Sequence, residues 1–339
     1  MKTLSGKQLS DLVHNVLDEY CDSEGYLNFS RFTAGQQEQY KADSKKRSVD
    51  YYKRTLASSN VILDFITDSD RFGIYYRWLS ATGHDATVFD LYVDGRLADY
   101  RTTENKSHDI ICFDLPEGEH RITLFLPWQV TVKIKSVVLS DNATVKKVKR
   151  EKRILSFGDS ITQGYHCKHP SLCYIGCMTR AFDAECLNQG IGGYWFEGES
   201  LDLELRCWKP NLITVAYGCN DYTIKDTAEE FKAGAEGFLK ALHEIFPDTP
   251  VLGILPIYRS DERFIARQKM VNYSLEDRRD ILIECYGKYS NTYVLEDTFF
   301  PSHADFFAPD LIHPNDLGFM VYGEAVTAKI QEIMHWAST

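Results

Sequence analysis

One stretch constrains the fold of this chain more than any other, and it reads RILSFGDSITQG over residues 153–164. A short run of apolar and small residues leads directly into Gly-Asp-Ser, and a second glycine follows four positions after Ser160. This pattern predicts a buried strand that ends in a sharp turn. In open α/β sheets, ligands bind at the carboxyl edge, where the loops that leave successive strands converge. Ser160 is therefore placed where a nucleophile is useful.

A serine hydroxyl attacks well only when a base takes its proton and hydrogen-bond donors hold the oxyanion that forms. The chain must then supply a histidine, an acid that orients it, and further donors. Three later segments carry such residues: 188–193 (NQGIGG), 218–221 (GCND) and 310–313 (DLIH). Each segment falls where a strand is expected to end, so we expect all three at the same edge of one sheet.

Together with the Gly-Asp-Ser turn, these segments resemble the SGNH/GDSL hydrolase family. The signature of that family is Gly-Asp-Ser, a glycine in an Asn-rich loop, a Gly-x-Asn-Asp block and Asp-x-x-His, and the resemblance extends over roughly residues 152–336. It implies that Ser160 is the nucleophile, His313 the base and Asp310 the acid that orients the base. It also implies three oxyanion donors: Ser160, Gly193 and Asn220.

Plainer interpretations exist for several of these residues. Ser160 suits a helix N-cap, and Asn220 suits an Asx turn. Neither alternative explains why such residues recur together at strand ends. Asp159 is adjacent to the serine, so we interpret it as a brace of the loop. Spacing favours His313 among the ten histidines, because Asp310 lies three residues earlier and can reach its ring. That contact would fix the tautomer that leaves the other ring nitrogen free.

Aromatic residues adjoin these segments and are candidates for the walls of a substrate pocket: Trp195, Tyr165 and Tyr222. A packing role suits Trp195 equally well. A group just after the serine turn has the residue types of a zinc site: His166, Cys167, His169, Cys173 and Cys177. It lacks a paired Cys-x-x-Cys, so we expect no metal there. The nine cysteines of the chain follow no framework spacing, which favours reduced thiols.

Length and charge limit the class of protein. A chain of 339 residues exceeds the usual size of one core, which favours two domains. A net charge of −11 argues against nucleic acid and anionic membranes as partners, since both require a basic surface. The first eight residues lack the apolar core of a secretory signal, so we expect a cytoplasmic protein. The sequence leaves the oligomeric state open, a homo-oligomer included.

The N-terminal part predicts a β-rich domain. Apolar residues spaced as one helix face predict a short lead-in helix over residues 5–20. Short strands separated by turns then follow from about 25 to 140, without a helical run, which favours a β-sandwich of the jelly-roll type. This module resembles the β-sandwich found ahead of some SGNH esterases that act on carbohydrate, most clearly at Phe89–Gly95. The basic segment 146–153 is interpreted as a solvated linker, which gives domains 1–148 and 149–339.

Strand and helix signals alternate after the linker, which is the pattern of a parallel sheet covered on both faces. Helices are predicted from Asp226, as an N-cap with Glu229 three residues later, and over 275–289 and 315–334. Strands are expected near 153–158, 184–189, 211–217, 250–257 and 292–296. This α/β arrangement is a flavodoxin-like three-layer sandwich, the fold that the family resemblance also implies.

The resemblance to SGNH/GDSL hydrolases implies a serine esterase that needs no cofactor. The likeness of the sandwich module to those of carbohydrate esterases favours a short acyl group, acetate first, on a sugar. A lysophospholipase or thioesterase is the alternative enzyme, although the chain lacks a long apolar lid. A carbohydrate-binding protein with a vestigial hydrolase domain is the alternative from another class, and the intact set of four residues argues against it: Ser160, Asn220, Asp310 and His313.

Overall fold

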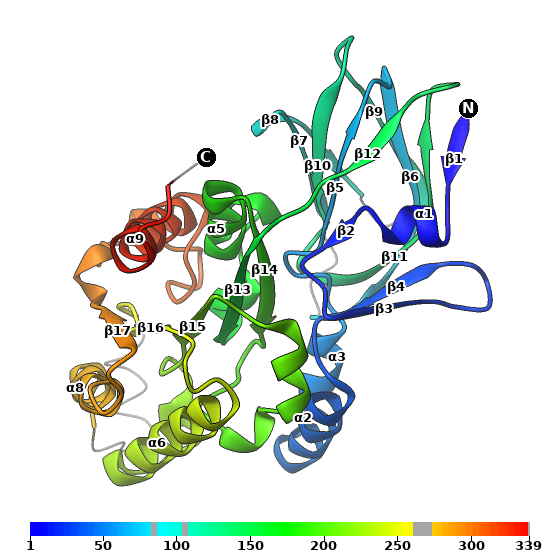
Figure 1. Cartoon of the computed structure of the whole chain (residues 1–339). Helices are drawn as coiled ribbons and strands as arrows, with labels where there is room; N and C mark the ends of the chain where they lie inside the picture. Colours follow the sequence, from blue (N-terminus) through cyan, green and yellow to red (C-terminus); the bar gives the residue numbers. More distant parts are fainter. Residues whose placement is uncertain (83–86, 104–107, 260–272, 338–339) are drawn as a thin grey trace. The chain divides into compact units, whose positions relative to one another are not determined.

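The computed structural model describes residues 1–82, 87–103, 108–259 and 273–337, and the chain forms two compact units (Figure 1). The first unit comprises Met1–Phe32, Lys53–Glu151 and His169–Ser171. The second unit comprises Thr33–Tyr52, Lys152–Lys168 and Leu172–Thr339. Segment 33–52 thus groups with the C-terminal part of the chain, and segment 169–171 groups with the N-terminal part. The domain boundary at that residue stays a prediction.

The first unit contains two antiparallel sheets, which confirm the predicted β-sandwich. One sheet has the order β3 (Asp18–Cys21), β4 (Leu27–Ser30), β11 (Val130–Leu139), β6 (Arg71–Ser80) and β9 (His108–Asp114), and β1 (Lys2–Leu4) also pairs with β11. The other has the order β12 (Val145–Lys147), β5 (Ile62–Thr67), β10 (His120–Phe125), β7 (Val88–Val93) and β8 (Arg96–Thr102), and β2 (Val13–His14) pairs with β5. Apolar side chains of both sheets form one core, among them Phe65, Phe72 and Leu124.

Two predictions for the N-terminal part are wrong. Residues 5–20 form only the short helix α1 (Lys7–Ser10), followed by β2 and β3, because the sandwich core takes up Leu9 and Leu12 without a continuous helix. Helices α2 (Ala34–Arg47) and α3 (Tyr51–Thr55) interrupt the region that was expected to hold strands alone. The buried positions of α2 are Gln36, Tyr40 and Asp43, so its inner face gives no apolar periodicity.

The basic segment before the second unit is not fully solvated. Arg150 belongs to this segment, yet its side chain is only 4% exposed and pairs with the buried Asp64 of β5. Arg121 and Thr123, both on β10, donate to the same carboxylate. A buried carboxylate needs such partners because its desolvation is otherwise costly. The prediction of a solvated linker is therefore wrong for Arg150.

The second unit contains a five-stranded parallel sheet, as predicted. Its order is β14 (Ala184–Gly190), β13 (Lys152–Gly158), β15 (Leu212–Ala216), β16 (Val251–Ile254) and β17 (Thr292–Leu295). Helices α5 (Tyr174–Phe182) and α9 (Asp316–Met334) lie together on one side of this sheet, and α6 (Ala228–Ile245) and α8 (Leu275–Tyr286) lie on the other (Figure 1). This is the flavodoxin-like three-layer arrangement.

Helix ends differ from prediction by a few residues. Helix α6 begins after Thr227, which forms a capping box with Glu230, one position later than the predicted Asp226 and Glu229 pair. Helix α8 ends at Tyr286, whereas α9 follows the N-cap Asn315 as expected. Within the described ranges, none of the helices has the length and hydropathy that a membrane span requires.

Candidate active site

The turn after β13 holds Ser160 at the carboxyl edge of the sheet. Asp159 is the N-cap of the short helix α4 (Ser160–Gln163), and its Oδ1 accepts a hydrogen bond of 2.9 Å from the amide of Ile161. Ser160 is the first residue of this helix, so its amide has no partner within the helix. The side chain and the amide of one residue are thereby both available at the end of a central strand.

His313 and Asp310 complete a relay that starts at Ser160. The distance between Ser160 Oγ and His313 Nε2 is 2.7 Å, and that between His313 Nδ1 and Asp310 Oδ2 is 2.6 Å. A carboxylate so close to Nδ1 requires the ring proton on that nitrogen, which leaves Nε2 to accept from the serine hydroxyl. This is the geometry of an activated serine.

Backbone amides fix the orientation of Asp310. Its Oδ1 accepts hydrogen bonds from the amides of Ile312, at 3.0 Å, and His313, at 3.1 Å. Leu311, between them, has a φ of 56° that lets the loop curl around the carboxylate. Burial alone would raise the pKa of Asp310, but the hydrogen bonds from the His313 ring and from the two amides hold it well below its ordinary value. Asp310 therefore remains ionised at neutral pH.

A second histidine contacts the same carboxylate. His166 Nε2 lies 3.1 Å from Asp310 Oδ2, and the ring centroids of His166 and His313 are 5.3 Å apart. One side-chain nitrogen or oxygen atom of each of these three residues lies within 4.8 Å of the corresponding atoms of the other two. The sequence placed His166 only among zinc-like residues and assigned it no role near the nucleophile; its position six residues after Ser160 is the one signal that could have done so.

The remaining members of that His-Cys group do not join this site. His169 belongs to the first unit, where its Nδ1 lies 2.7 Å from Asp90 Oδ1. Cys167 and Cys173 are buried, and burial raises the pKa of the Cys173 thiol to about 12. The same cause raises the pKa of Cys167 well above its ordinary value, so both thiols are neutral and apolar in character.

The loop after β14 presents the predicted donor Gly193. The φ of Gly193 is 76°, a conformation that glycine adopts without strain. Within the described ranges, the Gly193 amide donates no hydrogen bond. The loop is anchored to α4, because the Gly192 amide donates to Gln163 Oε1 at 2.8 Å and Asn188 Nδ2 donates to the Thr162 carbonyl at 2.7 Å. Gly193 is thereby tied to the helix that begins with the serine.

Asn220 approaches the same loop from the end of β15. Its Nδ2 donates to the carbonyl of Tyr194 at 3.1 Å. A side-chain amide carries two protons, so one N–H of Asn220 is left over from this bond. Two buried arginines hold the preceding residues: Arg278 donates to the Gly218 carbonyl at 2.9 Å and Arg259 to the Cys219 carbonyl at 2.6 Å.

These arginines carry no sequence signal, since each lies outside every recognisable block. Their guanidinium carbons lie 4.8 Å (Arg278) and 5.1 Å (Arg259) from the centre of the Tyr222 ring. Tyr222, a predicted substrate contact, is only 4% exposed. Its observed contacts include these two cation–π contacts within the protein.

The other two predicted substrate contacts differ in setting. Tyr165 stacks on the His313 ring, with centroids 5.6 Å apart, and thus lies at the relay. Trp195 is 3% exposed and packs against Tyr194 and Tyr51, with the guanidinium of Arg47 over its ring at 5.4 Å. Tyr51 and Arg47 come from the 33–52 segment, which sequence reasoning did not connect with this loop.

Two buried carboxyl groups stand behind the site. Burial raises the pKa of Asp159 to about 6 and that of Asp221 to about 7. One oxygen of Asp159 accepts a hydrogen bond from the Ile161 amide, and one oxygen of Asp221 accepts from the Phe196 amide. The second oxygen of each is buried without a hydrogen-bond partner in the described part of the chain. Both groups brace their loops, and neither contacts the His313 ring by a hydrogen bond there.

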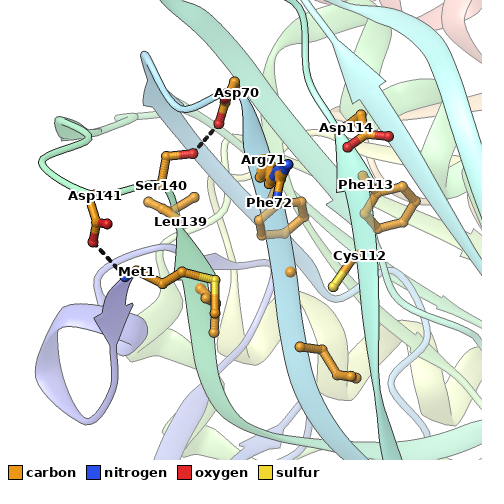
Figure 2. Close-up of a pocket in the computed structure, with 13 residues that line it drawn as sticks. Met1, Asp70, Arg71, Phe72, Cys112, Phe113, Asp114, Leu139, Ser140 and Asp141 are labelled. Atoms are coloured by element: carbon orange, nitrogen blue, oxygen red, sulfur yellow. Dashed lines mark hydrogen bonds and ion pairs between the residues drawn. The ribbon is translucent and has the colours of Figure 1, made fainter.

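A separate pocket of about 410 Å³ lies in the first unit, between the ends of β6, β9 and β11. Figure 2 shows Met1 and Cys112 at its apolar lining, and the Ser140 hydroxyl bonded to Asp70 at its rim. None of its lining residues belongs to the predicted site.

The fold and the site together define a class: a flavodoxin-like α/β protein with a Ser-His-Asp relay at the carboxyl edge of its sheet. Residues 156–321 match the model of the GDSL-like lipase/acylhydrolase family, and this domain belongs to that family. The comparison with curated proteins found no match. The sheet order, the relay and the family model thus agree on the same part of the chain.

Solved structures resemble the chain over nearly its whole length. A salicylyl-acyltransferase from a tetracycline biosynthetic pathway has a TM-score of 0.81 at 20% identity, covering 98% of this chain and 97% of its own. A Bacteroides ovatus protein classed as GDSL-like lipase has a TM-score of 0.78 at 18% identity, covering 100% and 99%. An acetyl xylan esterase from Butyrivibrio proteoclasticus has a TM-score of 0.65 at 12% identity, covering 99% and 100%. At these identities the likeness shows the fold.

Proposed function

We propose that this protein is a serine esterase that hydrolyses short acyl esters, acetyl esters first, on a carbohydrate. The observation that carries the proposal is the unbroken series of contacts from Ser160 through His313 to Asp310, at 2.7 and 2.6 Å. The GDSL-like domain supports acyl hydrolysis, and the likeness to an acetyl xylan esterase supports an acetylated sugar as the first substrate to test.

The geometry suits a two-step reaction. Ser160 Oγ attacks the ester carbonyl carbon while its proton moves to His313 Nε2. The carbonyl oxygen becomes an oxyanion, which accepts from three donors: the amides of Ser160 and Gly193 and the remaining N–H of Asn220. His313 then returns the proton to the oxygen of the leaving alcohol, and an acyl-Ser160 remains.

Water completes the cycle by the same groups. His313, neutral again, takes a proton from water as the water oxygen attacks the acyl carbon. The second oxyanion uses the same donors, and its collapse breaks the bond to Ser160 Oγ, which regains a proton from His313. Asp310 stays ionised throughout and stabilises the imidazolium formed in each step, in keeping with its lowered pKa.

A second candidate function is acyl transfer. The acyl-Ser160 would donate its acyl group to an alcohol if that acceptor took the place of water. The near-complete overlap with a salicylyl-acyltransferase, at a TM-score of 0.81, favours this candidate. Product analysis with and without an added alcohol or sugar acceptor separates the two, because a transferase yields a new ester and an esterase yields the free acid.

A panel of substrates tests the proposal. We expect turnover of p-nitrophenyl acetate and of acetylated xylo-oligosaccharides, with a steep decline from p-nitrophenyl butyrate to palmitate. A preference for the long chains would favour a lysophospholipase-type enzyme and would exclude the acetyl assignment. Release of thiols from acyl thioesters at a higher rate than any ester would favour a thioesterase.

Ser160→Ala is expected to lower kcat on the order of 10⁴-fold or more, because it removes the nucleophile. Folding should be unchanged, since the loss is one oxygen at a turn. Ser302→Ala is the matched control, because Ser302 is exposed in the same unit. An organophosphonate should label Ser160 alone, as located by mass spectrometry. Activity of the variant above a tenth of wild type, or a label on another serine, would exclude Ser160 as nucleophile.

A further inference from the structure

The carboxylate of Asp310 accepts from more groups than a triad requires. Oδ1 takes two backbone amides, and Oδ2 faces His313 Nδ1 at 2.6 Å and His166 Nε2 at 3.1 Å. Two imidazole nitrogens thus converge on the one oxygen that orients the base. A carboxylate oxygen has lone pairs for both, so the two contacts are compatible.

His166 is suited to donate as a neutral ring. The charged or titratable groups that act on it are Asp310, which raises its pKa, and His313, which lowers it; burial is the largest influence and brings the pKa below its ordinary value. At neutral pH the ring therefore carries one proton. With that proton on Nε2, His166 donates to Asp310 without placing a second positive charge beside the imidazolium of His313.

The backbone at His166 is held in an uncommon conformation. Its φ is 64°, in the left-handed region that favours glycine and asparagine. The segment around it is pinned, because the Tyr165 amide donates to the Ser160 carbonyl at 2.9 Å and the Lys168 amide donates to Asp316 Oδ1 at 2.6 Å. Glycine adopts this conformation without strain, so a glycine at this position removes the imidazole and leaves the backbone conformation accessible.

We propose that His166 is a positioning residue, which holds Asp310 Oδ2 in line with His313 Nδ1 and disperses the negative charge on that oxygen. The proposal rests on the function proposed for Ser160, His313 and Asp310. It predicts that loss of the donor lets the carboxylate rotate and also concentrates its charge on the bond to His313. The first effect slows turnover, and the second stabilises the protonated base.

Two variants distinguish the effect of the hydrogen-bond donor at position 166 from that of the backbone conformation there. His166→Gly keeps the left-handed conformation and removes the donor, whereas His166→Gln places an amide N–H at about the position of Nε2. We expect kcat on p-nitrophenyl acetate to fall about 10-fold in the glycine variant and to stay within about threefold in the glutamine variant. KM should change little in either. His335→Gly is the matched control, because His335 has a φ of 54° at the end of α9.

Two readouts respond to charge on Asp310 and not to packing. In His166→Gly the acid limb of the kcat/KM profile should move about 0.3 to 0.5 pH unit upward, because the protonated base is stabilised. The proton on His313 Nδ1, assigned by its loss in His313→Gln, should resonate further downfield in the ¹H NMR spectrum. His166→Gln should restore both values. His166→Asn, which tolerates the same φ and is too short to reach Asp310, replaces the glycine variant if that one does not fold.

Failure of this proposal is distinct from failure of the proposed function. If Ser160→Ala keeps wild-type activity, the proposed function is wrong, and the NMR signal still tests the contact between His166 and Asp310. If Ser160→Ala is inactive while the glycine variant keeps the wild-type rate, pH profile and proton shift, the role of His166 alone is refuted. The proposal is also refuted if the glycine variant loses rate, the glutamine variant does not restore it, and neither the pH profile nor the proton shift changes. His166 would then have a structural role alone.

Discussion

Asp64 in the sandwich unit and Asp159 in the α/β unit are both buried carboxylic acids, but their surroundings differ. Asp64 Oδ2 accepts from Arg121 and from Arg150, at 2.6 Å each. Burial would raise the pKa of Asp64, yet these arginines bring it below the ordinary value. Asp159 Oδ1 accepts from the Ile161 amide, its other oxygen has no partner in the described residues, and burial raises its pKa to about 6.

Asp64, with its two arginine partners, stabilises the fold when it is ionised, whereas ionisation of Asp159 destabilises it. A paired buried charge is favourable only while every partner is present. An unpaired one opposes folding whenever it is ionised, and such groups concentrate at functional sites. Asp159 directly precedes Ser160, so this unfavourable group lies at the residue that the proposed chemistry depends on.

The largest effect is expected in the sandwich unit. Asp64→Asn leaves two arginines without their counter-charge, and we expect a loss of about 3 to 5 kcal/mol in the free energy of unfolding. Asp99→Asn is the matched control, because Asp99 forms an exposed pair with Arg101 that should contribute no more than about 1 kcal/mol. Urea denaturation followed by circular dichroism measures both. Equal losses in the two variants would remove the contrast.

The second effect belongs to catalysis in the α/β unit. Asn220→Ala should reduce kcat on the order of 10² to 10³-fold with little change in KM, because an oxyanion donor acts mainly in the transition state. The fold should be retained, since within the described residues the Asn220 side chain makes one hydrogen bond, of 3.1 Å, to the Tyr194 carbonyl. Steady-state kinetics on p-nitrophenyl acetate provides the measurement. A rise in KM at constant kcat would instead assign Asn220 to substrate binding.

The α/β unit was predictable because its signals are local. Ser160 and Asn220 closely follow strands that are short apolar runs, so both could be placed from the sequence. His313 instead lies in a loop well after β17 ends at Leu295, and it could be placed only by its spacing from Asp310. The alternation of strands and helices admits few topologies, and the predicted one is confirmed. Helix ends were less certain, since Asp226 and Thr227 are both good caps and only the contacts of Glu230 choose between them.

What could not be predicted depends on contacts between distant residues. Segment 33–52 joins the α/β unit through polar groups: Gln36 and Gln189 bond reciprocally through their amides at 2.9 and 3.0 Å, and Tyr194 donates to Asp43 at 2.7 Å. Hydrophobic periodicity cannot reveal such a face. The contact of His166 with Asp310 likewise joins residues that are far apart in the sequence, as does the ion pair of Arg150 with Asp64.

The smallest effect concerns the pH dependence of stability. Asp159 has a pKa of about 6 when folded against an ordinary value of 3.8, so the unfolded chain loses this proton at lower pH than the folded chain. Ionisation therefore favours unfolding: the cost is absent below pH 3.8, grows between the two values and is constant above about pH 6. Asp159→Asn keeps an N-cap that accepts from the Ile161 amide and removes this cost.

Relative to wild type, the Asp159→Asn variant should gain about 1.4 kcal/mol in unfolding free energy on going from pH 5 to pH 8. Urea denaturation of both proteins at the two pH values measures the difference. Asp64→Asn provides the opposite case. Because the pKa of Asp64 is lowered in the folded protein, its ionised carboxylate contributes its full stability above pH 3.8, and this contribution is lost only as the pH falls further. Its difference from wild type should thus be the same at pH 5 and pH 8. A pH-independent difference for Asp159→Asn as well would mean that Asp159 is paired, and the contrast between the two carboxylates would disappear.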